Sequence, residues 1–228
     1  MNRKAGFIAA LLVLCAGAAC ADETVSALPA PAVDSSVDPS RATETAVLAG
    51  GCFWGMQGVF EHVKGVKQVL AGYSGGEAST AHYETVGTGR TGHAESVQIV
   101  FDPRIVSYGE ILRIYFSVMD PTTLNYQEPD QGTQYRSEVF YADPEQQRVA
   151  EAYVAQLEKA RAFSAPIVTQ LGALNGFYRA EGYHQDYLIL HPDQAYIAIN
   201  DLPKIEKLKR LYPQLYVERP VRVARSGG

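Results

Sequence analysis

The residue best placed to do chemistry is Cys52, which follows a short apolar stretch at residues 46–48 and the glycine pair Gly50 and Gly51. Large apolar residues recur at helical spacing after it, so Cys52 is expected to open a helix. At such a position, unpaired backbone N–H groups and the helix dipole favour a thiolate over a thiol. We therefore predict a reactive cysteine, although the commoner fate of a free cysteine is that of a small buried hydrophobic residue.

A second candidate is Glu95, which lies on a strand predicted over residues 93–101. The period of two places it on the same face as Val97, Ile99 and Phe101. Burial against that apolar face should raise the pKa of the carboxyl group and keep it protonated near neutral pH, as a general acid requires. Because Glu95 is near the end of the strand, a solvent-facing side chain is the equal alternative.

Aromatic residues directly follow Cys52. Trp54, the only tryptophan, lies off the apolar stripe of the predicted helix, so it is free to line a pocket. Phe53 fits that stripe, and periodicity alone therefore places it in the core.

Composition argues against several classes of function. The formal net charge of −5 does not favour binding to nucleic acid. The five histidines show no metal-ligand spacing and the chain has no C-x-x-C pair, so we expect no metal site. Cys15 and Cys20 lie in the N-terminal apolar region. Cys52 is thus the one thiol of the remaining chain, and no internal disulfide is expected there.

Residues 1–21 have the pattern of a secretory signal peptide, because Arg3 and Lys4 precede an apolar run that ends in small residues. The run is shorter than the ~20 apolar residues of a spanning helix, so export, to the periplasm, is favoured over a membrane anchor. Acylation of Cys20, which would give a lipid-anchored protein, is the alternative. Residues 22–44 are rich in Ala and Pro and have no regular period, which predicts a flexible linker.

Residues 45–215 carry regular patterns and are predicted to form one catalytic domain, followed by a basic tail over residues 216–228. The predicted order of elements is strand, helix, strand, strand, helix, strand, helix. It suits an α+β fold of the split β-α-β (ferredoxin-like) type, a two-layer sandwich with a mixed sheet and extra C-terminal segments. Strands are expected near residues 46–48, 66–72, 93–101, 137–141 and 167–171, and helices from residue 52 and near 111–118, 144–161 and 204–211.

Four strings resemble motifs of the A-class peptide methionine sulfoxide reductases: GCFWG at 51–55, GHAE at 92–95, GTQYRS at 132–137 and AEGYHQDYL at 180–188. The likeness runs in order from about Thr45 to His191. It implies thiol-dependent reduction of the S epimer of methionine sulfoxide, free or in proteins, and hence repair of oxidised exported proteins.

The resemblance also implies a role for each matching residue. Cys52 would attack the sulfoxide sulfur and become a sulfenic acid, while Glu95 delivers a proton to the departing oxygen. Tyr83 and Tyr135 would donate hydrogen bonds to that oxygen. The substrate-binding positions would be Phe53 and Trp54, around the S-methyl group, and Asp130 in the matching polar loop.

The sequence departs from many members of that family, which carry resolving cysteines near the C-terminus, because residues 53–228 contain no cysteine. The resolving thiol is therefore expected to be external, from a thioredoxin-like protein or a small thiol. No bound cofactor is expected, and the protein is expected to be a monomer. Met119 stands where the family often has histidine, which could alter substrate preference.

Two other functions fit the residue types. A cysteine hydrolase or acyltransferase would pair Cys52 with His93 or His184 and a carboxylate such as Glu95, and would form a thioester without any reductant. An exported binding module with a merely buried Cys52 would react slowly with alkylating reagents.

Overall fold

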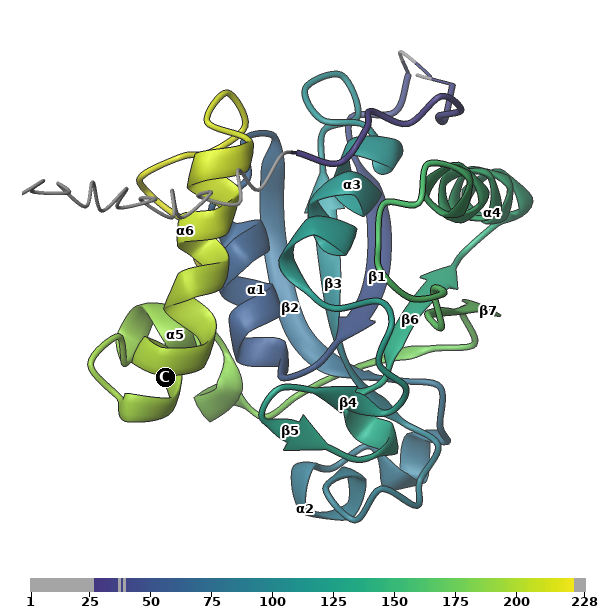
Figure 1. The fold of residues 1–228 in the computed structure, drawn as a ribbon. Coiled ribbons are helices and arrows are strands. Elements are labelled where there is room, and N and C mark those ends of the chain that lie inside the picture. The colour runs from purple at the N-terminus through teal and green to yellow at the C-terminus, as the bar shows by residue number, and fades with distance from the viewer. Residues whose placement is uncertain (1–26, 37, 39, 224–228) are drawn as a thin grey trace, which may run out of the picture.

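Six strands form one mixed sheet, and the main helices pack on one of its faces in the computed structural model, which describes residues 27–36, 38 and 40–223 (Figure 1). The strand order is β7-β6-β1-β3-β2-β8, and all neighbours are antiparallel except β6 and β7. The strands are β1 (Glu44–Gly50), β2 (Val66–Ser74), β3 (Ala94–Phe101), β6 (Ser137–Tyr141), β7 (Gln170–Ala173) and β8 (Phe177–Arg179). A separate hairpin is formed by β4 (Tyr126–Gln127) and β5 (Asp130–Gln131).

The chain order β1, α1, β2, β3, α3, β6 confirms the predicted split β-α-β arrangement, because β3 lies between β1 and β2. The later strands β7 and β8 extend the two edges of the sheet. In Figure 1, α1 and α3 cover the sheet, α6 lies over α1, and α4 lies beside β6. The helices are α1 (Phe53–Glu61), α2 (Tyr83–Val86), α3 (Tyr108–Val118), α4 (Pro144–Lys159), α5 (Tyr187–Leu190) and α6 (Leu202–Leu211).

Alternation along the central strands separates two apolar layers. In β1, Ala46 and Leu48 belong to the main core beneath the helices, whereas Val47 and Ala49 belong to a smaller cluster on the opposite face. In β3, the main core contains the residues that share a face with position 95, namely Val97, Ile99 and Phe101. The helix-covered face of the sheet is therefore the face toward which the Glu95 side chain projects.

The predicted strand over residues 167–171 is displaced, since β7 begins only at Gln170. Val168 instead donates its backbone N–H to the Pro121 carbonyl at 2.8 Å, in a loop contact outside the sheet. The preceding helix α4 begins as expected, with the Asp143 side chain accepting the backbone N–H groups of the first turn. It ends at Lys159, two residues early, and Arg161 has a positive φ of 49°.

Residues 27–36, part of the predicted flexible linker, contact the helical layer. Tyr153 donates its hydroxyl to the Pro29 carbonyl at 2.9 Å, and Arg113 donates to the Leu28 carbonyl at 2.7 Å. Asp34 accepts the Gly109 backbone N–H at 2.8 Å. Two of these three contacts are made by backbone carbonyls, so a sequence without a regular period can still pack against the helices. The predicted signal peptide, residues 1–21, lies outside the described residues, and none of the helices described is both long enough and apolar enough to cross a membrane.

The chain also continues as packed structure into the predicted basic tail. The backbone N–H of Val217 donates to the His62 carbonyl at 2.8 Å, and that of Val221 donates to the Glu61 carbonyl at 2.9 Å. Val223 donates to Asp186 Oδ1 at 3.0 Å. The carbonyls that end a helix lack partners within it, so the end of α1 offers acceptors to this segment. Residues 224–228 lie outside the described part.

Glu61, at this junction, is expected to make stability fall as pH rises. The side chain is 1% exposed, and neither carboxyl oxygen has a hydrogen-bond partner within the described residues. Burial, reinforced by Asp186, raises the pKa of Glu61 to about 9. The folded state therefore retains a proton that the unfolded state has lost above its normal pKa. Each pH unit between the two pKa values then lowers the free energy of unfolding by up to about 1.4 kcal/mol.

We expect Glu61→Gln to flatten this pH dependence, because glutamine cannot ionise. Urea unfolding at pH 6 and pH 8 would measure it, with the exposed Glu84→Gln variant as the control. If Glu61→Gln and the wild type lost equal stability between those two pH values, the raised pKa would be contradicted.

Candidate functional site

Cys52 caps the N-terminus of α1, as the sequence predicts, and it is 7% exposed. The turn from β1 into α1 requires Gly51, whose φ is +86°. A Cβ at Gly51 would also lie 2.7 Å from the Gln127 side chain. Glycine is therefore needed here both for the backbone conformation and to leave room for the Gln127 side chain.

The pKa of Cys52 differs in direction from the sequence expectation. Burial raises the pKa of the thiol well above its normal value, and Glu95 and Asp201 raise it further. The Trp54 backbone N–H and Lys204 lower it by less. The helix start therefore acts as expected, but it is outweighed by desolvation, and the resting protein carries a neutral thiol at neutral pH.

Glu95, on β3, faces the start of α1, where Cys52 lies. Its side chain is 4% exposed, and Oε2 accepts the backbone N–H of Phe53 at 3.0 Å, the first residue of the helix that Cys52 caps. Burial raises the pKa of Glu95 to about 8, against the opposing effect of the Phe53 hydrogen bond. The structure thus resolves the alternative left open by the sequence, since the carboxyl group is buried and largely protonated at neutral pH.

Tyr83, the first residue of α2, and Tyr135, the last residue of a 3-10 turn, reach this centre from the connections that precede β3 and β6. The pKa of each phenol is raised by burial first, and then by Glu95 and Cys52 among other groups. Glu181 positions Tyr83 by accepting its backbone N–H at 3.0 Å. Arg136 joins the two connections, because it donates to the Thr133 and Gly92 carbonyls, each at 3.0 Å. Both predicted hydroxyl donors therefore lie in the electrostatic neighbourhood of Cys52.

Tyr196 is a member of the site that sequence reasoning missed. Its hydroxyl donates to Asp130, the predicted substrate-binding residue, and burial and the Cys52 charge raise its pKa. Its ring lies edge-on to Trp54 with centroids 6.0 Å apart. Tyr196 is separated from these partners by 66 residues or more, and only its place just beyond the AEGYHQDYL string could have drawn notice.

The aromatic residues after Cys52 are held on both sides. Trp54 stacks on Tyr187 with centroids 3.9 Å apart, and it donates its indole N–H to His184 Nδ1 at 3.1 Å. Phe53 is 1% exposed and packs against Tyr73 and His184. The Trp54 ring is therefore held in one orientation by Tyr187 and His184. Phe53 belongs to the core, as its spacing predicts, and it also borders the site.

The two histidines of the hydrolase alternative are engaged elsewhere. His93 Nδ1 accepts the Gly76 N–H at 3.2 Å, and its Nε2 contacts the Glu77 carbonyl oxygen at 3.1 Å. His184 Nδ1 accepts the Trp54 indole N–H, and its Nε2 lies 3.9 Å from Glu181 Oε2. Neither imidazole is hydrogen-bonded to Cys52 in the part of the chain that the structure describes, so the thiol and imidazole pair of a cysteine hydrolase is not formed. Within the described residues, no group of three or more His, Cys, Asp or Glu side chains is arranged to hold a metal ion.

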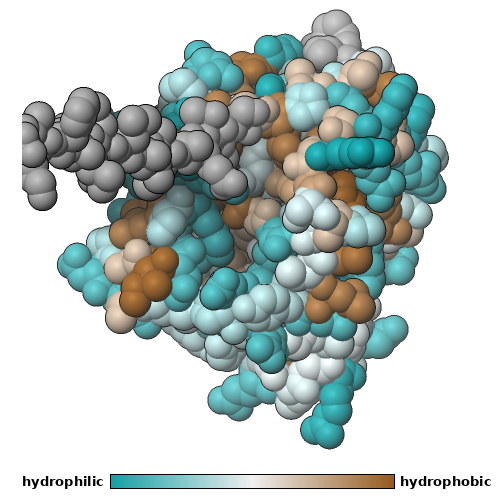
Figure 2. Space-filling view, viewed as in Figure 1, coloured by the Kyte–Doolittle hydropathy of each residue, from teal (hydrophilic) through white to brown (hydrophobic). Residues whose placement is uncertain are grey.

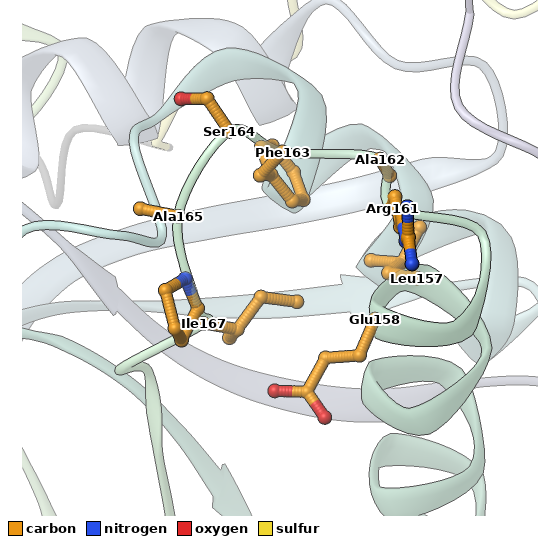
Figure 3. Close-up of a pocket in the computed structure, with 9 residues that line it drawn as sticks. Leu157, Glu158, Arg161, Ala162, Phe163, Ser164, Ala165 and Ile167 are labelled. Carbon is orange, nitrogen blue, oxygen red and sulfur yellow. The ribbon is translucent and has the colours of Figure 1, made fainter.

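Other surface features lie apart from this centre. The cavity in Figure 3 is at the C-terminal end of α4, where Phe163 and Ile167 from the following loop face Glu158 and Arg161, and no candidate site residue lines it. Figure 2 shows hydrophobic surface on the lobe that contains α5. In the segments that flank α5, Tyr183 is 62% exposed and Ile199 is 71% exposed.

A buried thiol at a helix start, a protonated carboxyl group beside it and converging phenols define a thiol-based enzyme site in an α+β fold. The family model described as peptide methionine sulfoxide reductase matches residues 44–215. The chain belongs to that family and, by its relatives, to the A class, and its activity is the reduction of methionine sulfoxide.

The relatives are similar over most of their length. Peptide methionine sulfoxide reductase MsrA 2 of Mesorhizobium japonicum is 57% identical over 182 residues, which is 79% of this chain and 93% of the relative. MsrA 2 of Synechocystis is 50% identical over 190 residues, 81% of this chain and 88% of the relative. The structure of methionine sulfoxide reductase A of Corynebacterium diphtheriae has a TM-score of 0.59 and 34% identity, and covers 74% of this chain and 84% of its own.

Proposed function

We propose that Cys52 is the nucleophile and Glu95 the general acid in reduction of the S epimer of methionine sulfoxide. One arrangement supports these roles most strongly. Glu95, with a pKa raised to about 8, accepts the N–H of the residue next to Cys52 and is buried with it. A proton donor and a sulfur nucleophile thus lie in one buried site, and the proposal places the sulfoxide between them.

The first step conserves atoms and electrons without an added cofactor. The Cys52 sulfur attacks the sulfoxide sulfur while Glu95 protonates the sulfoxide oxygen, and the thiol proton then replaces the one that Glu95 gave. The protonated oxygen then passes from the methionine sulfur to the Cys52 sulfur, which breaks the original S–O bond and the S–S bond formed in the attack. Methionine leaves reduced by two electrons, and Cys52, oxidised by two, becomes a sulfenic acid. Tyr83 and Tyr135 stabilise the negative charge that develops on the oxygen. A neutral resting thiol fits this route, because its proton is used within the step.

An external thiol, from a thioredoxin-like protein or a small molecule, completes the cycle. It displaces water from the sulfenic acid to form a disulfide with Cys52, and a second thiol opens that disulfide. The sequence supports this, because residues 53–228 hold no other cysteine. We also propose that the protein is exported as a monomer and repairs exported proteins. Exposed Tyr183 and Ile199, close in sequence to His184 and Tyr196, offer contacts for residues that flank a methionine sulfoxide.

One experiment tests stereochemistry and intermediate together. We expect the protein, incubated with a racemic methyl aryl sulfoxide and excess dithiol, to consume the S epimer and leave the R epimer, as chiral chromatography would show. This expectation rests on fixed groups around Cys52, because Phe53 packs against Trp54 and its backbone N–H holds Glu95.

Without dithiol, the reaction should stop after one sulfide is formed per Cys52. Dimedone, which traps sulfenic acids, should then label that residue, as mass spectrometry of the Cys52 peptide would show. Equal loss of both epimers, or sustained turnover without any thiol, would contradict the proposed reaction.

A further inference from the structure

A buried ion pair lies near Cys52, and the reaction above gives it no role. Lys204 Nζ lies 3.0 Å from Asp201 Oδ1. The Asp201 side chain is fully buried, and that of Lys204 is only 18% exposed. Water screens charges poorly in such a place, so both charges act on neighbouring groups.

The ion pair of Asp201 and Lys204 packs directly against α1, because Gly55 has no side chain there. A Cβ at this position would overlap the Asp201 carboxylate and lie 3.0 Å from Lys204 Nζ. Gly55 is three residues after Cys52, so both charged groups touch the first turn of the helix that Cys52 caps.

Asp201 does not serve as an ordinary helix cap. It ends a π-helical turn, Ile197–Asp201, that leads directly into α6, and its side chain accepts no capping hydrogen bond there. Oδ2 has no hydrogen-bond partner within the described residues. A buried carboxylate with one unsatisfied oxygen is destabilising, which a structural role alone does not explain.

We propose that Asp201 and Lys204 are positioning residues for Cys52, in which Asp201 holds the sulfur as a thiol and Lys204 favours the thiolate. The inference rests on the proposed role of Cys52 as nucleophile. In the resting protein the two opposite charges largely cancel. When an external thiol opens the Cys52 disulfide, the Cys52 sulfur leaves as a thiolate, and the ammonium of Lys204 stabilises it until it is protonated.

Other groups also act on Cys52. Burial raises the pKa of the thiol most, Glu95 and Asp201 raise it further, and Lys204 lowers it. The phenols that interact with the thiol are those of Tyr83, Tyr135 and Tyr196. All of these side chains except the ion pair are kept in the variants below. Asp201 also raises the pKa of Glu95 and of Tyr196, so the comparison of Lys204→Met with Lys204→Arg, which keeps Asp201, is the most direct one.

The test is the pH dependence of Cys52 alkylation by iodoacetamide, followed on the Cys52 peptide by mass spectrometry. We expect Asp201→Asn to lower the midpoint by about one pH unit and Lys204→Met to raise it by about one unit. The double variant should return close to the wild-type midpoint. Lys204→Arg keeps the charge and should retain the wild-type midpoint.

Unchanged midpoints, or shifts of both single variants in the same direction, would overturn the proposal. If Asp201→Asn does not fold, the alkylation midpoints of Lys204→Met and Lys204→Arg still test the proposal. Equal midpoints for these two variants would overturn the proposal. Alkylation does not depend on sulfoxide reduction. Opposite shifts in a protein that reduces no sulfoxide would therefore reject the proposed reaction while leaving the electrostatic coupling established.

Discussion

Replacing Cys52 with serine is expected to lower kcat/KM for reduction of methionine sulfoxide by about 10⁴-fold or more. The serine hydroxyl is a far weaker nucleophile than sulfur. Its oxygen also cannot accept the sulfoxide oxygen, whereas the Cys52 sulfur accepts it and becomes a sulfenic acid. The remaining contacts would still bind substrate, so the loss should fall on kcat more than on KM. Methionine formed in the presence of a dithiol, measured by chromatography, gives both constants.

Exposed Glu84→Gln is the control, because it changes a solvent-facing side chain and keeps Cys52. It should turn over at the wild-type rate. Dimedone labelling should vanish in Cys52→Ser and persist in Glu84→Gln. A Cys52→Ser protein that retains more than about a tenth of the wild-type kcat/KM would show that another group is the nucleophile.

The residues predicted correctly from the sequence are those whose placement depends on local pattern. Helical spacing after Cys52 placed the thiol at the start of α1, where the structure has it. Alternation along β3 placed Glu95 among residues that face the helices. What the strand pattern could not decide was whether the strand end turns to solvent. The Phe53 N–H decides it, by holding the carboxyl group inside.

Residues whose role depends on contacts between distant segments could not be predicted in this way. Tyr196 meets Asp130 from 66 residues away, and Asp201 meets Gly55 from the far end of the domain. Neither lies in a repeated pattern, and Asp201 followed by Leu202 and Pro203 resembles the start of an ordinary capped helix. Only the packing of the C-terminal segment against β5 and α1 reveals what these side chains touch.

The predicted direction of the Cys52 pKa shift was wrong for a related reason. A helix start is visible in the sequence, and its dipole stabilises a thiolate by a limited amount. Desolvation depends on everything packed around the sulfur, and here it is the larger effect. The charges of Glu95 and Asp201, from other elements, raise the pKa further. The Cys52 thiol of the resting protein is therefore kept in its neutral, less oxidisable form.

Glu95→Gln is expected to slow sulfoxide reduction by about 10²- to 10⁴-fold. Glutamine can still accept the Phe53 N–H through its carbonyl oxygen, so the start of α1 should be retained, but it has no proton to give. The wild-type rate should fall as pH rises through about 8, because ionisation removes the acid form of Glu95. That fall should be absent in Glu95→Gln, as rates measured from pH 6 to pH 9.5 would show.

Alkylation of Cys52 separates loss of the acid from damage to the fold. Above about pH 8 the ionised Glu95 raises the pKa of the Cys52 thiol in the wild type. Glu95→Gln lacks that charge, so its thiol should react faster with iodoacetamide at pH 9 although it reduces sulfoxide more slowly. A misfolded site would expose the thiol and alkylate faster at pH 6.5 as well, where Glu95 is protonated and Glu95→Gln should react at the wild-type rate. Exposed Glu84→Gln should match the wild type at both pH values. A Glu95→Gln protein within tenfold of the wild-type rate, or a wild-type rate still rising at pH 9, would exclude Glu95 as the acid.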